Sequence, residues 1–257
     1  MKSAIFITVR MKSSRLPRKA LLEIKGKPVI EHLIDRLKLA KSLDLIVLCT
    51  STHPDDAVLV DIARKNQIES FRGSEDDKLD RYLNAARRYG VDFIIVTEGD
   101  NIFYEPEVID EVINLYSKTK ADYVDCRELP VGTAPHGIKV EALEKVCQIK
   151  SEADTEVWGG YFTDSGLFKV EYLEVPAELR HPEIRMTLDY PEDYEFFKAI
   201  FDRLYRQGNV FSLRDIVSLL KENPELMDIN RSMQEAYMEH LKESAPVKLK
   251  DVPGAGS

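Results

Sequence analysis

A basic loop that also carries hydroxyl groups is the part of this sequence best suited to chemistry. Residues 10–19 read Arg-Met-Lys-Ser-Ser-Arg-Leu-Pro-Arg-Lys and follow a short apolar run, residues 4–9, that predicts a buried strand. The loop has neither a Walker A Gly-Lys-Ser/Thr ending nor a G-x-G-x-x-G turn. Arginine grips phosphate oxygens with paired hydrogen bonds, and lysine adds a compact positive charge. We therefore expect these side chains to hold the β- and γ-phosphates of a nucleotide and to stabilise departing pyrophosphate.

The charge of the chain is unevenly distributed. The 257 residues carry a formal net charge of −9, yet residues 1–27 contain eight basic side chains and a single acidic one. The overall acidity argues against a nucleic-acid partner. The basic cluster favours a local anion site, although a solvated loop explains it as well. No apolar run approaches the ~18 residues of a membrane span, and three scattered cysteines predict neither disulfides nor a zinc site. We expect a cytoplasmic protein with no membrane partner.

Strands and helices alternate over the first 125 residues, which is typical of βαβ units and a mostly parallel sheet. Ligands of such sheets bind beyond the carboxyl ends of the strands, where both the basic loop and Asp100 fall. The expected fold is therefore α/β, with a mostly parallel central sheet flanked by helices. The predicted strands are residues 4–9, 45–49, 68–71, 91–96 and 121–126, and the predicted helices begin at Pro28, Pro54, Asp77 and Pro106.

The remainder of the chain is less regular. Glycines and prolines punctuate short apolar runs between residues 130 and 183, which we interpret as a mixed or antiparallel insertion within a single domain, residues 1–244. Residues 245–257 are polar and end in Pro-Gly-Ala-Gly-Ser, so we expect a disordered tail. We predict one more strand at residues 185–188, and C-terminal helices at residues 191–205, 213–221 and 229–242.

Four motifs in a fixed order resemble those of one enzyme family. The loop has the form R-x-x-S-S-R-L-P-x-K and is followed by Gly-Lys-Pro-Val-Ile at residues 26–30. The other motifs are residues 71–82, Gly-Asp-Asn at 99–101 with residues 105–110, and residues 188–193. In these motifs the chain resembles the cytidylyltransferases of the CMP-KDO and CMP-sialate synthetase superfamily, most closely the branch typified by spore coat polysaccharide biosynthesis protein F. The resemblance implies a Rossmann-like nucleotidyltransferase fold, CTP as donor, Mg²⁺ as cofactor and a homodimer.

The same resemblance assigns roles to individual residues. Asp100 and Asp189 would hold Mg²⁺, which commonly takes one or two carboxylates together with phosphate oxygens and water. Arg15 and Lys19 would act with these two aspartates in catalysis. The implied triphosphate contacts are Arg10, Ser14, Arg15 and Lys19, and the implied base and ribose contacts are Arg72, Ser74 and Asp77.

Simpler structural roles compete with some of these assignments. Asp100 follows a glycine and would serve as a turn residue, and Asp189 precedes the proline that opens a helix and would serve as its cap. A salt bridge or a helix N-terminus accounts for Arg72 and Asp77 nearly as well as a nucleotide does. If both aspartates do form a metal site, their carboxylates should repel each other without the ion. Replacing one by asparagine should then leave the melting temperature level or raise it.

Departures from the family pattern concern the loop and the acceptor. Arg18 stands where the family often has glycine, and Asn101 and Ile102 stand where it commonly has a proline and an aliphatic residue. The second departure points to an acceptor other than the usual sugar acid. His136 lies in a stretch similar to a family motif and Trp158 stands beside two glycines, so both are candidate acceptor contacts. Trp158 is equally well explained as a core residue.

These observations lead to one main hypothesis and two alternatives. We expect a magnesium-dependent cytidylyltransferase that transfers CMP from CTP to a sugar, sugar acid or small phosphorylated acceptor, with release of pyrophosphate, for surface glycan biosynthesis. The first alternative keeps the enzyme class and uses UTP or GTP. The second is a catalytically inactive nucleotide-binding regulatory module, which the presence of both Asp100 and Asp189 argues against.

Overall fold

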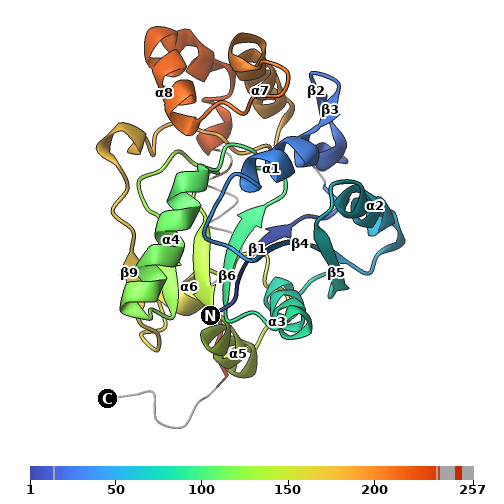
Figure 1. Ribbon diagram of the computed structural model, residues 1–257, viewed down its shortest axis with the longest axis vertical. Helices are drawn as coiled ribbons and strands as arrows, with labels where there is room; N and C mark the ends of the chain where they lie inside the picture. The colour runs from blue at the N-terminus through green and yellow to red at the C-terminus, as the bar shows by residue number, and fades with distance from the viewer. Residues whose placement is uncertain (14, 236, 238–246, 251–257) are drawn as a thin grey trace.

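The computed structural model describes residues 1–13, 15–235, 237 and 247–250, and these form an α/β fold around a central sheet (Figure 1). Within the described residues, seven strands make up this sheet in the order β5-β4-β1-β6-β8-β7-β9. β8 pairs antiparallel with both neighbours, whereas all other neighbouring strands are parallel, so the mostly parallel sheet is confirmed. The strands are β1 (Ser3–Thr8), β4 (Leu45–Ser51), β5 (Glu69–Gly73), β6 (Phe93–Glu98), β7 (Tyr123–Asp125), β8 (His136–Lys139) and β9 (Val170–Tyr172).

Helices flank the sheet, and several begin at recognisable signals. Proline occupies the first helical position of α4 and α7, where its missing N–H costs nothing. Asp77 caps α3 and Ser212 caps α8, each accepting from a backbone N–H three residues on. The helices are α1 (Val29–Leu37), α2 (Ala57–Lys65), α3 (Lys78–Tyr89), α4 (Pro106–Thr119), α5 (Val140–Ile149), α6 (Gly160–Thr163), α7 (Pro191–Leu204) and α8 (Leu213–Glu222), with 3-10 helices η1 (Lys19–Leu21), η2 (Pro54–Asp56), η3 (Ala177–Leu179) and η4 (Pro224–Ile229) and the small hairpin β2 (Glu23–Ile24) and β3 (Lys27–Pro28).

Two hydrophobic clusters lie on opposite faces of the sheet. Successive residues of β1 point to opposite faces, so Ile5 and Ile7 belong to one cluster and Ala4 and Phe6 to the other. The first cluster takes side chains from α1, α4, α7 and α8, and the second takes side chains from α3 and α5. Figure 1 shows α3 and α5 side by side, well away from α7 and α8. Both clusters therefore share one central sheet.

The order of the strands reverses beside β1. The chain runs outward from β1 through β4 to β5, and then crosses back to β6 on the other side of β1. The connections that leave the carboxyl ends of β1 and β6 therefore diverge, which is where open α/β sheets bind ligands. The basic loop, residues 10–19, and the turn at Gly99 and Asp100 leave the sheet at this point.

The predicted strand at residues 185–188 is wrong. Met186 and Leu188 are fully buried, as the apolar alternation requires, but Arg185 makes only an isolated bridge to Val131. The segment forms no strand, and its polar side chains, Arg185 and Thr187, instead hydrogen-bond the Asp189 carboxylate. The predicted insertion contributes β8 and β9 to the central sheet and contains α5, which the pattern of glycines and prolines did not predict.

Part of the predicted tail is ordered. Ser151 N donates to Lys248 O over 3.0 Å, and Lys250 N donates to Ile149 O over 2.8 Å. Disorder is therefore the wrong prediction for residues 247–250, which pair with backbone groups just after α5. The rest of the tail lies outside the described residues, as do residues 236 and 238–242 of the helix predicted at residues 229–242. The predicted start of that helix is wrong, because Ile229 ends η4 and, among the described residues, helical structure resumes only at Met233. Among the residues described, no helix has the length and apolar character needed to cross a bilayer.

Candidate active site

A cavity of about 510 Å³ opens at the carboxyl ends of β1 and β6. The basic loop, the turn after β6, the start of α3 and residues 187–189 all contribute to its walls. The cavity lacks the net positive charge that the basic N-terminal segment suggested, because acidic side chains from other segments balance the basic ones. The five basic side chains in its lining are Arg10, Lys12, Arg15, Lys19 and Lys78, and the five acidic ones are Asp76, Glu98, Asp100, Glu156 and Asp189.

Lys19 lies between the two aspartates that we predicted to bind metal. Its Nζ forms an ion pair with Asp100 Oδ2 and lies 2.8 Å from Asp189 Oδ1. Arg15 Nη2 contacts the same Asp189 oxygen at 3.2 Å. Four residues assigned to catalysis therefore meet in one cluster, although 170 positions separate Lys19 from Asp189 in the sequence.

The cluster fixes the charge of its members. Burial alone would lower the pKa of Lys19, but Asp100 and Asp189 outweigh burial and raise this pKa above its usual range. Burial would likewise raise the pKa of Asp189, but Lys19, Arg15 and Arg185 outweigh it and the pKa falls to about 2. The two aspartates do not face each other as unshielded charges, because the Lys19 ammonium lies between them. This arrangement reverses our expectation for stability: replacing either aspartate should destabilise the protein.

A buried network holds Asp189 in place. Asp193, on α7, accepts from Asp189 N at 2.9 Å and from Tyr190 N at 3.0 Å. Arg185 donates to both oxygens of Asp193, at 2.8 and 2.9 Å, and its Nη2 lies 3.4 Å from Asp189 Oδ2. Tyr190 is the N-cap of α7, and Asp193 completes the cap. The capping role that we considered for Asp189 is therefore wrong, and its carboxylate lines the cavity.

Gly99 allows the ends of β1 and β6 to approach each other. A Cβ at this position would lie 2.5 Å from the Cβ of Val9, so a larger residue would force the strand ends apart. Gly99 N also donates to Thr8 O at 2.8 Å, which ties the turn to β1. Asp100 follows as a turn residue, and its side chain contacts Lys19. Its turn position and its place in the site are thus compatible.

Asp56 holds the start of the basic loop. Its buried carboxylate accepts from Met11 N at 2.7 Å, from Thr50 Oγ1 at 3.0 Å and from Ser51 N at 3.1 Å. Burial would raise the pKa of Asp56, but a hydrogen bond from Ser51 Oγ at 2.5 Å, together with those from Met11 N, Thr50 Oγ1 and Ser51 N, outweighs it and lowers the pKa below its ordinary value. Asp56 therefore fixes the loop relative to the end of β4. Sequence reasoning missed it, because an aspartate just after Pro54 looks like an ordinary helix-start residue.

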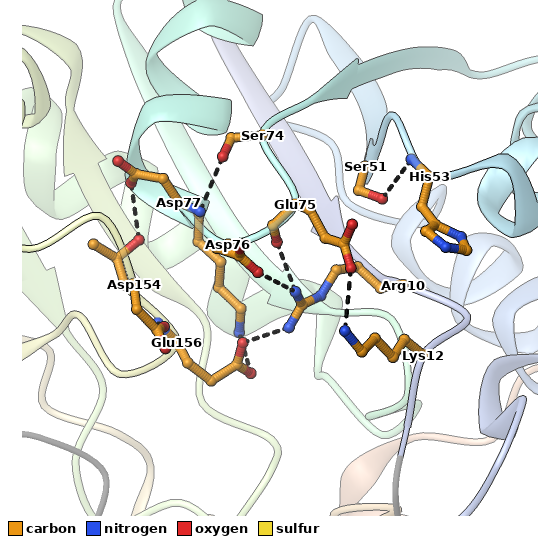
Figure 2. A network of polar contacts seen from close by, with 12 residues as sticks. Arg10, Lys12, Ser51, His53, Ser74, Glu75, Asp76, Asp77, Asp154 and Glu156 are labelled. Atoms are coloured by element: carbon orange, nitrogen blue, oxygen red, sulfur yellow. Dashed lines mark hydrogen bonds and ion pairs between the residues drawn. The ribbon is translucent and has the colours of Figure 1, made fainter.

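Ion pairs bridge the other end of the cavity (Figure 2). Arg10 Nη2 lies 2.7 Å from Glu156 Oε2, and Arg10 Nη1 donates to Glu75 O at 2.6 Å. Lys78 Nζ lies 3.0 Å from Glu156 and 3.4 Å from Glu98. Burial would lower the pKa of Lys78, but the two carboxylates outweigh it and raise this pKa. Sequence reasoning also missed Lys78, Glu98 and Glu156, because single charges in charged segments form no pattern.

The predicted base and ribose contacts lie outside the cavity lining. Arg72 donates from Nε and Nη2 to two backbone carbonyls, over 2.9 and 2.7 Å. Ser74 Oγ accepts from Asp77 N at 3.1 Å, and Asp77 caps α3 and forms an ion pair with Lys150. Asp77 thus has the helix-start and salt-bridge role that the simpler interpretation held, whereas Arg72 bonds backbone carbonyls and forms no salt bridge among the described residues. Contact of either residue with the nucleoside stays a prediction. Ser14 lies outside the described residues.

The two candidate acceptor contacts pack against each other. Trp158 is buried, and its ring centroid lies 5.6 Å from that of His136 in an edge-on arrangement. The His136 ring hydrogen-bonds the Tyr123 hydroxyl at 2.9 Å and lies 3.4 Å from Asp125. Neither candidate lines the cavity. The core position of Trp158 is confirmed, and acceptor contact by either residue stays a prediction.

Asp100 and Asp189 offer a donor set that fits a hard divalent cation. Both carboxylates reach one cationic atom, Lys19 Nζ, from segments far apart in the chain, so the fold brings two oxygen ligands to one point. The described part of the chain contains no group of three or more His, Cys, Asp or Glu side chains that would hold a metal ion. Two carboxylates suit Mg²⁺, which completes its shell with phosphate oxygens and water.

The sheet topology and the charged cavity at the strand reversal define an α/β protein of the nucleotidyltransferase class. The solved structure of a cytidylyltransferase from Leptospira borgpetersenii matches with a TM-score of 0.80 and 28% identity, over 88% of this chain and 97% of that one. Residues 4–217 match the cytidylyltransferase family model. The chain belongs to the cytidylyltransferase family, as its four motifs predicted, and is therefore a nucleotidyltransferase.

Two relatives match along nearly their whole length. Spore coat polysaccharide biosynthesis protein SpsF of Bacillus subtilis is 30% identical over 226 residues, which cover 85% of this chain and 94% of that protein. An uncharacterized protein of Methanocaldococcus jannaschii is 34% identical over 245 residues, which cover 93% of this chain and 99% of that protein.

Proposed function

We propose that the protein is a magnesium-dependent enzyme that transfers CMP from CTP to a small acceptor and releases pyrophosphate. The meeting of Arg15, Lys19, Asp100 and Asp189 in one cavity carries this proposal. Membership of the cytidylyltransferase family supports CTP as the donor. An acceptor oxygen forms a new bond to the α-phosphorus while the bond to pyrophosphate breaks, and the acceptor hydroxyl gives up its proton. Such transfers depend on positioning and charge neutralisation, which these residue types supply.

The basic loop binds and orients the triphosphate in this proposal. The Arg15 contact with Asp189 is 3.2 Å, and Arg15 Nε has no acceptor among the described residues. The guanidinium is therefore available to turn toward phosphate oxygens. Lys19 neutralises both aspartates in the resting site, and near the α-phosphate it would neutralise the charge that develops during transfer. Asp56 keeps the loop at the end of β1 while this happens.

Asp100 and Asp189 would hold the magnesium ion. When bound, Mg²⁺ neutralises the phosphates and keeps the attacking and leaving oxygens aligned. Arg185 and Asp193 prepare the site, because they fix the Asp189 carboxylate and its backbone before any ligand arrives. The chain's own contribution is thus a preorganised pair of oxygen ligands beside a cationic loop.

We infer that the acceptor is a sugar, a sugar acid or a small phosphorylated molecule destined for a surface glycan. The name of the Bacillus subtilis relative supports a role in polysaccharide synthesis. Asn101 and Ile102, which depart from the family pattern, are buried directly after Asp100, so the departure lies beside the reacting centre. The homodimer and the cytoplasmic location stay predictions.

Calorimetric titration of CTP, UTP, GTP and ATP, with and without Mg²⁺, tests the proposal without requiring an acceptor. CTP should bind most tightly, and Mg²⁺ should strengthen its binding. Asp100→Asn should lose this magnesium-dependent gain, whereas Asp202→Asn should keep it, because Asp202 is an exposed residue outside the cavity lining.

Each other outcome of the titration has a defined meaning. Tightest binding of UTP or GTP would favour the alternative donor. Nucleotide binding with a magnesium effect that Asp100→Asn leaves intact would favour the regulatory module. Failure to bind any of the four nucleotides would refute the proposal.

A further inference from the structure

Arg10 and Lys78 share a single carboxylate at the rim of the cavity (Figure 2 shows its Arg10 side). Glu156 Oε2 lies 2.7 Å from Arg10 Nη2, and Glu156 Oε1 lies 3.0 Å from Lys78 Nζ. Each oxygen thus faces a different cation, from the basic loop on one side and from the first residue of α3 on the other. Two oxygens of one phosphate group would make the same contacts, because both anions offer charged oxygens to N–H donors.

The Glu156 side chain can rotate out of the cavity while its backbone stays in place. Its neighbour Thr155 is fully buried, and the Thr155 hydroxyl accepts from Leu79 N at 3.1 Å and lies 3.0 Å from Asp77 Oδ1. The Glu156 side chain is 51% exposed, so its carboxylate can rotate into water, where it is solvated. Asp100 and Asp189, at 18% and 9% exposure, are held far more firmly.

Lys78, in contrast, needs an anionic partner. Its side chain is only 8% exposed, and once Glu156 rotated away Glu98, at 3.4 Å, would be its one remaining carboxylate partner among the described residues. A buried ammonium that loses one of its two carboxylate partners is less well compensated for its burial. A triphosphate that entered the cavity would meet balanced charges and would need an acidic side chain to yield its place. Glu156 is the most exposed of the acids that contact a cavity cation at hydrogen-bond distance.

We propose that Glu156 holds the place of a phosphate group of the nucleotide, and that Lys78 and Arg10 bind that phosphate after Glu156 rotates out. This inference rests on the proposed nucleotide binding and adds Lys78, which lies in the motif at residues 71–82 but was assigned no role there, as a nucleotide-binding residue. Glu156 then acts as a competing internal anion that sets the affinity of the resting site.

Affinity for CTP and for inorganic pyrophosphate tests the proposal. Glu156→Gln removes the competing charge and keeps the size of the side chain, so both ligands should bind about two- to fivefold more tightly, as expected for loss of a half-exposed ion pair. Lys78→Met should weaken both by about tenfold or more, since a charged hydrogen bond to phosphate is lost. Lys78→Arg should restore most of the affinity. Glu152→Gln is the matched control, because Glu152 lies in the same segment and pairs with Lys248 outside the cavity.

The outcomes separate this inference from the proposed function. Unchanged or weaker binding in Glu156→Gln would show that the Arg10–Glu156 pair organises the site, and would overturn the inference. Wild-type affinity in a Lys78→Met variant with a normal melting temperature would overturn the role of Lys78. If Lys78→Met fails to fold, the Lys78→Arg and Glu156→Gln variants provide the test instead. Wild-type protein that binds no CTP at all would instead refute the proposed function.

Discussion

Replacing Asp189 by asparagine removes the charge that Lys19, Arg15 and Arg185 share and keeps the size of the side chain. The surrounding cations hold the pKa of Asp189 at about 2 against the opposing effect of burial, compared with an ordinary value of 3.8. Because one pKa unit is worth about 1.4 kcal/mol, this lowering corresponds to about 2 kcal/mol of stability. In the variant, Lys19 still pairs with Asp100 and Arg185 still pairs with Asp193. The loss of stability should therefore not greatly exceed this magnitude. We expect the variant to be less stable at pH 7 by about 2 kcal/mol, or roughly 4–8 °C in melting temperature.

The pH dependence of this deficit gives a second check. The pKa of Asp189 is lower in the folded protein than in the unfolded chain, so its stabilisation is complete above about pH 4 and is lost as the pH falls toward about 2. Urea unfolding should therefore give the same deficit at pH 7 and pH 5, and a smaller one at pH 3.

Asp202→Asn serves as the control for this experiment. Asp202 is 63% exposed and pairs only with Lys25 among the described residues, so its replacement should cost less than about 1 kcal/mol. An Asp189→Asn protein with a level or raised melting temperature would refute the reasoning. That result would mean that the two aspartates repel each other and that Lys19 does not hold them together.

Two further predictions concern the basic loop. Arg15→Ala should weaken CTP binding by about tenfold or more but CMP binding by less than about threefold, because its contacts are assigned to the outer phosphates; equal losses in calorimetry would contradict that assignment. Asp56→Asn should lower the free energy of unfolding by about 1–3 kcal/mol and weaken CTP binding, since an amide oxygen cannot satisfy all the donors that Asp56 serves. Asp55→Asn, at an exposed neighbouring position, is its control; wild-type urea unfolding of Asp56→Asn would count against the anchoring role.

The parts of the site that continuous patterns encode were predictable from the sequence. The apolar runs of β1 and β6 placed the basic loop and Asp100 at one edge of the sheet, and the structure brings Lys19 to Asp100 there. Family motifs supplied Asp189, whose contact with Lys19 depends on α7 and the network at its start. Pattern and resemblance together therefore recovered the end of the cavity where Lys19, Asp100 and Asp189 meet.

The other end of the cavity was not predictable in this way. Lys78 faces Glu98 and Glu156 only because α3, β6 and the segment after α5 converge in space. Arg72 and Asp77 lie in a family motif, yet the structure uses them to hold backbone carbonyls and to cap α3. A sequence motif thus shows that certain residues occur together in the chain. Their burial and their neighbours in the folded structure decide whether they face a ligand.

The cancelling charges of the cavity bear on how a nucleotide would reach the proposed site. Enzymes with a cleft of one sign of charge focus the electric field and draw in ligands of the opposite sign from a distance. Here equal numbers of basic and acidic side chains line the cavity, and the whole chain carries −9. An anionic nucleotide that binds as proposed would therefore meet no attraction at long range, and salt would screen only the repulsion from the net negative charge of the chain. If a phosphate of the ligand takes the place of Glu156 as proposed, recognition would begin only on contact, beside Arg10 and Lys78.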